Sequence, residues 1–116
     1  MPVLGSEAWV EAFGAACAAG GARAPRSLVL QQELTDSGTA WHLVVGPEGI
    51  DVVYGRHPAP DIALSEDTAT ARAVGRGELS AQQAFMDGRL RVRGAVGRLS
   101  EVAAVLATLP PVPGEG

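Results

Sequence analysis

The sequence predicts an α+β domain in which helices cover one face of a mostly antiparallel sheet. Apolar residues recur at helical spacing near both ends of the chain, whereas residues 27–64 contain segments in which apolar and polar residues alternate, as in strands. The predicted order is one helix, four strands, two helices, one strand and a final helix. Because strands and helices come in separate runs, an α+β arrangement is favoured over an alternating α/β one.

The length and composition indicate one globular domain. The chain has 116 residues, of which 47% are hydrophobic and 19% charged. This length fits one hydrophobic core and leaves little room for a second. The sequence contains no internal repeat. We therefore expect a domain over residues 1–109, followed by a disordered tail over residues 110–116.

The first predicted element is an amphipathic helix. Ser6 is a suitable N-cap, because its side chain can accept a hydrogen bond from the first turn. Trp9, Phe13 and Cys17 then recur at helical spacing, and Gly20-Gly21 ends the segment.

Three alternating segments follow, over residues 27–34, 41–45 and 50–54. They are separated by the turn-forming sequences Asp36-Ser37-Gly38 and Pro47-Glu48-Gly49. Strands joined by such short turns pair with their neighbours in the chain, so we predict an antiparallel meander.

A short fourth strand is predicted over residues 61–64, after a segment rich in proline. The sequence Ser65-Glu66-Asp67 then predicts the cap of a helix that extends to about Arg76. The two carboxylates are interpreted as charges at the helix N-terminus, where the dipole favours them.

The last part of the chain predicts a short helix, a strand and a final helix. Ser80 and Gln83 form a capping box for a helix over residues 81–87, and Gly88 allows the turn into an alternating strand over residues 89–93. The final helix begins near Val96 and ends at Pro110-Pro111; its apolar stripe consists of Leu99, Val102, Ala103, Leu106 and Leu109.

Charge argues against several classes of partner. The net charge is −4, and all nine basic residues are arginines. A mildly acidic chain lacks the positive surface typical of proteins that bind nucleic acids or anionic membranes. Residues 1–20 have no basic segment like that of a signal peptide, and no apolar run is long enough to span a membrane. We therefore expect a cytoplasmic protein with no stable membrane insertion and no nucleic-acid partner.

One segment resembles a known family. The sequence Ala84-Phe85-Met86-Asp87-Gly88 leads into Arg89-Leu90-Arg91-Val92-Arg93-Gly94, in which arginines and aliphatic residues alternate up to a glycine. This segment is similar to the most characteristic one of the sterol carrier protein family, a sterol-binding and non-specific lipid-transfer domain. The segment Asp61–Asp67 and the order of elements are also similar. The chain thus resembles a bacterial single-domain member.

The resemblance implies a five-stranded sheet covered by helices, with an apolar tunnel between the two layers. It also implies a protein that is not an enzyme and binds a fatty acid, fatty acyl-CoA, sterol or phospholipid without a metal or cofactor, for transfer or presentation. The apolar side chains that we expect to line such a tunnel are Phe13, Trp41, Leu43, Val52, Phe85, Met86, Val92, Leu99, Val102 and Leu106.

Two of these assignments leave alternatives open. Phe85 and Met86 could equally be ordinary core residues. The row formed by Arg89, Arg91 and Arg93 fits a solvated strand face, or else contact with a ligand headgroup or CoA phosphates.

Catalytic chemistry has little support in the sequence. Nucleophilic catalysis needs a Ser or Cys near an oriented His, but the chain has only His42, expected on an exposed strand face, and His57, expected in a loop. No metal-binding spacing occurs, and Cys17, the single cysteine, reads as a buried apolar residue. Two alternatives remain: an enzyme for a hydrophobic metabolite that uses His42, Tyr54 or Asp51, or a fully packed interaction module.

Overall fold

The computed structural model describes residues 3–21 and 23–108 and leaves aside the side chains of residue 103 and residues 106–108. The predicted helix end at Pro110-Pro111, the tail over residues 110–116 and the stripe residue Leu109 therefore lie outside the described residues.

The first helix forms as predicted. Helix α1 spans Glu7–Gly20, and the Ser6 hydroxyl accepts a hydrogen bond of 3.2 Å from the backbone nitrogen of Trp9. The helix ends at Gly21, whose φ of 66° is a left-handed conformation that glycine adopts without steric cost. Its inward face is apolar and includes the buried side chains of Trp9, Val10, Phe13 and Cys17.

The predicted antiparallel meander is confirmed. Strand β1 (Leu28–Leu34) pairs with β2 (Ala40–Gly46), which pairs with β3 (Gly49–Tyr54). Leu30 lies directly opposite Leu43, and both side chains are fully buried. The period-two alternation of the sequence therefore decides which side of the sheet faces the helices.

Two more strands complete a mixed five-stranded sheet in the order β3-β2-β1-β4-β5. Strand β4 (Ile62–Glu66) is parallel to β1, and β5 (Leu90–Gly94) is antiparallel to β4. The other two pairings are antiparallel, so the prediction of a mostly antiparallel sheet holds.

The predicted boundary after β4 is partly wrong. Ser65 and Glu66 do not cap a helix, because they pair with β1 and β5 as the last residues of β4. Only Asp67 is the N-cap of helix α2 (Thr68–Gly75), where its carboxylate accepts a hydrogen bond of 2.7 Å from the backbone nitrogen of Thr70. Strand pairing with two neighbours outweighs the local capping signal.

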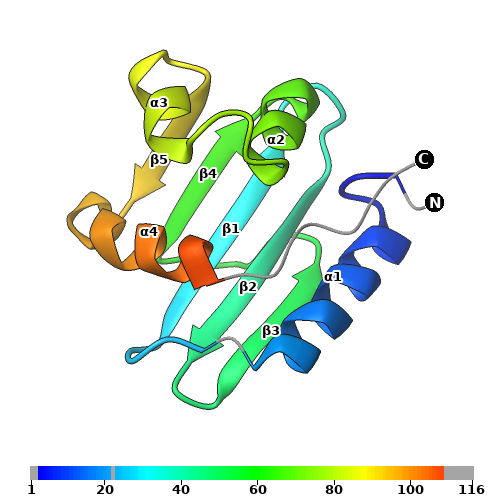
Figure 1. Ribbon diagram of the computed structural model, residues 1–116, viewed down its shortest axis with the longest axis vertical. Coiled ribbons are helices and arrows are strands. Elements are labelled where there is room, and N and C mark those ends of the chain that lie inside the picture. Colours follow the sequence, from blue (N-terminus) through cyan, green and yellow to red (C-terminus); the bar gives the residue numbers. More distant parts are fainter. Residues whose placement is uncertain (1–2, 22, 109–116) are drawn as a thin grey trace.

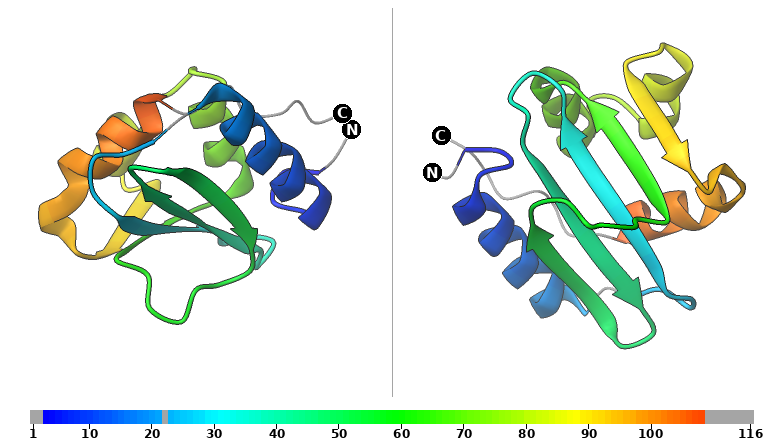
Figure 2. Two further views of the ribbon diagram at one scale, coloured as in Figure 1. Left: turned by 90° about the horizontal axis from the view of Figure 1, so that it is seen from below. Right: turned by 180° about the vertical axis from the view of Figure 1, so that it is seen from behind.

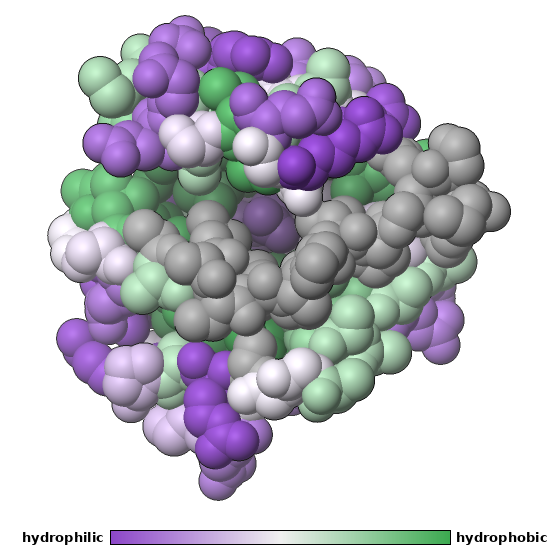
Figure 3. Space-filling model, in the orientation of Figure 1, coloured by the Kyte–Doolittle hydropathy of each residue, from purple (hydrophilic) through white to green (hydrophobic). Residues whose placement is uncertain are grey.

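The helices that the structure describes all lie on one face of the sheet (Figure 2). Helix α1 packs along β3, whereas α2, α3 (Ala81–Met86) and α4 (Leu99–Thr108) lie over the half that contains β4 and β5 (Figure 1). Helix α4 follows a single 3-10 turn, η1 (Val96–Arg98). Figure 3 shows the helical face, with a hydrophilic residue set back among apolar residues near its centre.

The opposite face of the sheet is crossed by residues 55–61, which connect β3 to β4 (Figure 2). This crossing corrects the expectation that His42 is exposed: its side chain is only 7% exposed. His42 Nδ1 lies 2.9 Å from the carbonyl oxygen of Gly55, and its ring lies 5.1 Å from that of His57. The connection was expected to be a loop, but its path over the sheet could not be read from local sequence.

Candidate ligand-binding site

The site is organised around helix α4, whose position depends on Arg98. The guanidinium of Arg98 donates hydrogen bonds to the backbone oxygen of Ser27 at 2.9 Å and to the Glu101 carboxylate at 2.6 Å. It also lies 3.9 Å from the carboxylate of Asp61. Because Ser27 precedes β1 and Asp61 precedes β4, Arg98 ties the start of the helix to the edge where both strands begin.

An apolar cavity of about 260 Å³, here called the α3–α4 cavity, lies on one side of α4. It is bordered by α3, α4, β4 and β5 and open to solvent on one side, and its walls are almost entirely apolar. The lining residues are Leu64, Ala81, Gln82, Phe85, Leu90, Val92, Leu99, Ser100 and Val102. A cavity of this character suits an apolar guest and offers no group for chemistry on it.

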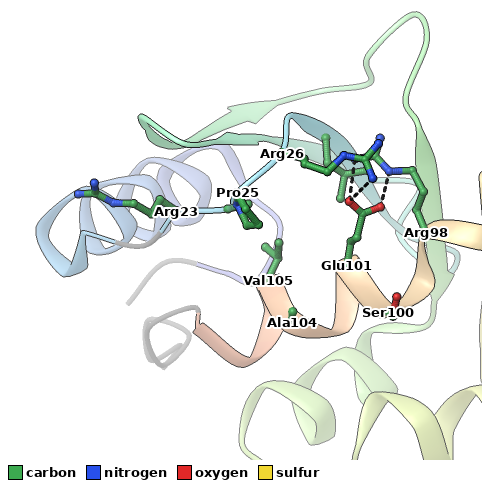
Figure 4. Close-up of a pocket in the computed structure, with 10 residues that line it drawn as sticks. Arg23, Pro25, Arg26, Arg98, Ser100, Glu101, Ala104 and Val105 are labelled. Carbon is green, nitrogen blue, oxygen red and sulfur yellow. Dashed lines mark hydrogen bonds and ion pairs between the residues drawn. The ribbon is translucent and has the colours of Figure 1, made fainter.

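A second cavity of about 290 Å³, here called the linker cavity, lies on the other side of α4 (Figure 4). It opens between α4 and the segment that joins α1 to β1. Its apolar part comprises Ala24, Pro25, Leu28, Ala104 and Val105, and its polar part Arg23, Arg26, Arg98, Ser100 and Glu101. Three arginines against one glutamate leave this rim positive, although the whole chain carries a charge of −4.

Two of the three arginines, Arg26 and Arg98, form ion pairs with Glu101. Glu101 lies between Arg98 and Arg26, and its carboxylate is 3.3 Å from the Arg26 guanidinium (Figure 4). The hydrogen bonds from Arg98, with the charge of Arg26, lower the pKa of Glu101. Arg23 points away from this cluster in Figure 4, and no carboxylate partner for it is found in residues 3–21 and 23–108.

The structure brings together four of the ten proposed ligand-contacting residues. Phe85, Val92, Leu99 and Val102 all line the α3–α4 cavity. Met86, the neighbour of Phe85, is 71% exposed and does not line that cavity.

Of the remaining five, the four that the structure describes do not line this cavity. Phe13, Trp41 and Leu43 are deeply buried core residues, and Val52 is half-buried against them on β3. The side chain of Leu106 lies outside the described part of α4. Phe13 and Trp41 each lie close to Trp9, with ring centroids 5.2 and 5.0 Å apart respectively, in an aromatic cluster under α1.

Sequence reasoning missed two residues that form the floor of the α3–α4 cavity. Leu64 and Leu90 point to the helical side of β4 and β5 and line the cavity with Val92. The alternation in each strand marks them as inward-facing, but which inward residues border a void depends on how α3 and α4 pack. The linker cavity was missed because it depends on a long-range contact of α4.

Glu66 is a further polar residue on the helical side of the sheet. Its side chain is only 9% exposed, and its Oε2 atom is buried without a hydrogen-bond partner among the residues described. Burial raises the pKa of Glu66 from its ordinary value of 4.5 to about 7, and the neighbouring charge of Asp67 adds to this shift. Glu66 is therefore a buried residue of β4, and its interpretation as a charge at a helix N-terminus is wrong.

The outer face of the sheet, opposite the helices, differs from the helical face. It carries a network of polar side chains centred on Glu33. The Glu33 carboxylate accepts hydrogen bonds from Gln31 at 2.6 Å, Arg93 at 2.7 Å and Ser65 at 3.2 Å. Although burial favours the neutral carboxyl, these bonds and the charge of Arg93 hold the pKa of Glu33 below its ordinary value. Arg93 thus has a structural partner on a solvated face.

The residues considered for catalysis do not meet at the α4 cavities. His42 and Asp51 belong to the outer face of β2 and β3, and Tyr54 lies at the end of β3, half exposed. Within the described ranges, no group of three His, Cys, Asp or Glu is arranged to hold a metal ion. In the same residues no helix combines the length and apolar character needed to cross a bilayer.

Comparison with known families decides how this fold is classified. Residues 13–107 match the model of the SCP-2 sterol transfer family. The chain belongs to this family. The matched range covers every described strand, helices α2 and α3, the second half of α1 and all but the last residue of α4, so SCP-2 membership applies to the domain as a whole. Comparison with curated protein sequences finds no match.

Solved structures support the SCP-2 fold at low sequence identity. Sterol carrier protein 2 like 2 from Aedes aegypti matches with a TM-score of 0.66 and 21% identity, over 88% of this chain and 96% of that one. The UbiJ-SCP2 ubiquinone synthesis protein matches with a TM-score of 0.64 and 18% identity, over 90% of this chain and 92% of that one. Both of these SCP2 proteins are matched over more than nine tenths of their own length.

An enzyme also contains this fold as a small part. The inverting sec-alkylsulfatase Pisa1 from Pseudomonas sp. matches with a TM-score of 0.58 and 16% identity, over 68% of this chain. The match spans only 13% of the sulfatase chain. Such a likeness concerns the fold alone and carries no sulfatase activity to this protein.

Proposed function

We propose that this protein binds a lipid-like apolar molecule between helix α4 and the sheet, for transfer or presentation. The ligand classes are fatty acids, fatty acyl-CoA, sterols and phospholipids. The observation that carries the proposal is the α3–α4 cavity, whose apolar walls include Leu64, Leu90 and Val92 from the sheet and Leu99 and Val102 from α4. SCP-2 membership supports the same function.

The two cavities beside α4 indicate how a longer ligand fits. Ser100 borders both cavities, Val102 lines one and Val105 the other. Each volume lies near the lower limit of ligand pockets, which is about 300 Å³. A long acyl chain or a sterol therefore occupies both, and α4 moves outward so that its buried valines no longer separate them. The resulting space is the tunnel between sheet and helices.

Occupation of the α3–α4 cavity can be tested with a matched pair of variants. Leu99→Trp fills the cavity from α4, whereas Val96→Trp adds the same ring three residues earlier, at a position 57% exposed and outside the lining. Displacement of a fluorescent fatty acid is measured for both. We expect Leu99→Trp to weaken binding about tenfold or more and Val96→Trp to leave it unchanged.

Native mass spectrometry of the purified protein provides an independent measurement. A bound lipid retained from the host appears as added mass, and lipid extraction then identifies its class. If wild type binds no acyl chain, sterol or acyl-CoA in either experiment, the proposed function is wrong.

A further inference from the structure

Two polar side chains lie next to each other on the largely apolar helical side of the sheet. Gln32 on β1 is opposite Leu64 on β4, and Leu34, two residues along β1, is opposite Glu66. Gln32 and Glu66 are therefore diagonal neighbours on one face of the parallel pair, where such neighbours are about 7–8 Å apart.

Both side chains have an unused hydrogen-bonding atom. The Gln32 oxygen accepts a hydrogen bond of 2.7 Å from the Trp41 indole, which fixes the amide so that Nε2 is its free donor. The Glu66 Oε2 atom is buried and unpaired. In residues 3–21 and 23–108, neither Gln32 Nε2 nor Glu66 Oε2 has a hydrogen-bond partner.

This pair borders the proposed ligand space. Leu64, opposite Gln32, and Leu90, opposite Glu66, both line the α3–α4 cavity. An apolar molecule that extends from this cavity along the sheet therefore reaches the pair next. A buried carboxylate without a hydrogen-bond partner destabilises the ligand-free protein. A ligand that donates a hydrogen bond to Glu66 removes this cost and therefore binds more tightly.

The chemistry of the pair selects the polar group of the guest. A hydroxyl group can donate to the Glu66 carboxylate and accept from the Gln32 amide at the same time. A ligand carboxylate could accept from Gln32 but would place a second negative charge beside Glu66. A plain hydrocarbon would leave both protein atoms unpaired.

We propose that Gln32 and Glu66 form the specificity-determining pair of the site and select apolar alcohols, which carry a hydroxyl group, over apolar carboxylates. This inference rests on the proposed function and narrows its ligand class. The raised pKa of Glu66 supports it, because that shift reflects a carboxyl held in apolar surroundings without a donor.

The test compares dodecan-1-ol with dodecanoate at pH 8, using displacement of one fluorescent probe. Wild type is expected to bind the alcohol about tenfold more tightly than the carboxylate. Glu66→Gln removes the charge but keeps an amide that can bond a hydroxyl, so the alcohol affinity stays within about threefold while the dodecanoate affinity rises about tenfold.

A second variant and a control separate recognition from folding. Glu66→Leu removes the unpaired carboxylate and is expected to raise the midpoint temperature of thermal unfolding. The same variant is expected to bind dodecan-1-ol about tenfold more weakly than wild type. Glu33→Gln changes the same chemical group on the adjacent strand but on the outer face, and it should leave the alcohol-to-carboxylate ratio unchanged.

The outcomes distinguish this inference from the function on which it rests. Equal wild-type affinity for the two ligands, or a ratio that Glu66→Gln does not change, overturns the role of the pair while lipid binding stands. If wild type binds neither ligand nor the probe, the proposed function fails and the inference fails with it.

Discussion

Gln32 and Trp41 face each other across β1 and β2, and the Trp41 indole nitrogen donates a hydrogen bond of 2.7 Å to the Gln32 side-chain oxygen. This bond is partly buried, and it joins Gln32 to the aromatic cluster that Trp41 forms with Trp9. It gives the buried Trp41 indole a hydrogen-bond acceptor, and it leaves Nε2 as the free donor of the Gln32 amide.

The bond predicts a measurable coupling. Gln32→Leu leaves the buried Trp41 nitrogen without an acceptor and should lower the free energy of unfolding by about 2 kcal/mol. Adding Trp41→Phe to Gln32→Leu removes the unpaired donor. The free energy of unfolding of the double variant should therefore fall by less than the sum of the decreases in the two single variants. Urea denaturation of the four proteins measures the coupling. If the two decreases in the free energy of unfolding were additive, the hydrogen bond between Gln32 and Trp41 would contribute nothing to stability.

Because the pKa of Glu66 is raised in the folded protein, we expect the stability of the fold to fall as the pH rises toward and through neutrality. Its pKa is about 7 in the folded protein and 4.5 ordinarily, so the folded state binds more protons between these values. The free energy of unfolding should therefore drop by roughly 3 kcal/mol from pH 4.5 to pH 7.5. Denaturation at several pH values measures this drop, and Glu66→Gln should remove it from the curve.

The charges near Glu66 provide a control. Asp67 raises the pKa of Glu66, and hydrogen bonds from Thr70, with a smaller contribution from the charge of Arg89, lower the pKa of Asp67 itself. Asp67→Asn keeps an N-cap oxygen for α2 but removes the charge. It should shift the pH-dependent drop to lower pH. A curve identical to that of wild type would contradict the assignment of the transition to Glu66.

Substitution of Gly94, the last residue of β5, is expected to lower the stability of the fold strongly. Its φ is 100°, and a Cβ atom there would lie 2.5 Å from the backbone oxygen of Asp61. Gly94→Ala should lower the free energy of unfolding by at least about 2 kcal/mol, from both backbone strain and this clash. Gly38→Ala is the matched control, because φ is 73° and no atom lies within 4 Å of the added carbon. It should cost about 1 kcal/mol. Equal losses would mean that the close approach is unimportant.

Cys17 should report on opening of the core. It is the single cysteine of the chain, is 1% exposed, and burial raises the pKa of its thiol. An aromatic disulfide reagent should therefore modify it only as fast as α1 detaches from the sheet. Ala19→Cys in a Cys17→Ala background places a thiol at an exposed position of the same helix and should react at once. Similar rates at the two positions would show that Cys17 is accessible.

The elements were largely predictable because their signals are local. The Ser6 and Ser80 caps form where the sequence predicts them, and α1 ends at Gly21, within the Gly20-Gly21 pair predicted to end it. The meander follows from short turns between alternating segments. Glu66 shows the limit: a carboxylate before a helix reads as a cap, but pairing with β1 and β5 takes it into the sheet.

The candidate site was only partly predictable. The pattern of inward-facing apolar residues predicts Phe85, Val92, Leu99 and Val102 as ligand contacts, and these four line one cavity. Phe13 and Trp41 satisfied the same pattern and are packed core residues instead. An inward-facing apolar residue fills space or borders it according to its neighbours on other elements, which periodicity does not specify.

The sequence by itself determined the helices, the strands, their inward faces and the family, because caps, turns and alternation act over a few residues. Only the tertiary structure decided that β4 lies parallel to β1, that residues 55–61 bury His42, and that Gln32 and Glu66 are neighbours beside a cavity. The β1–β4 relationships join residues about 30 positions apart and the contact of His42 with Gly55 spans 13, so the packing of the whole chain sets them.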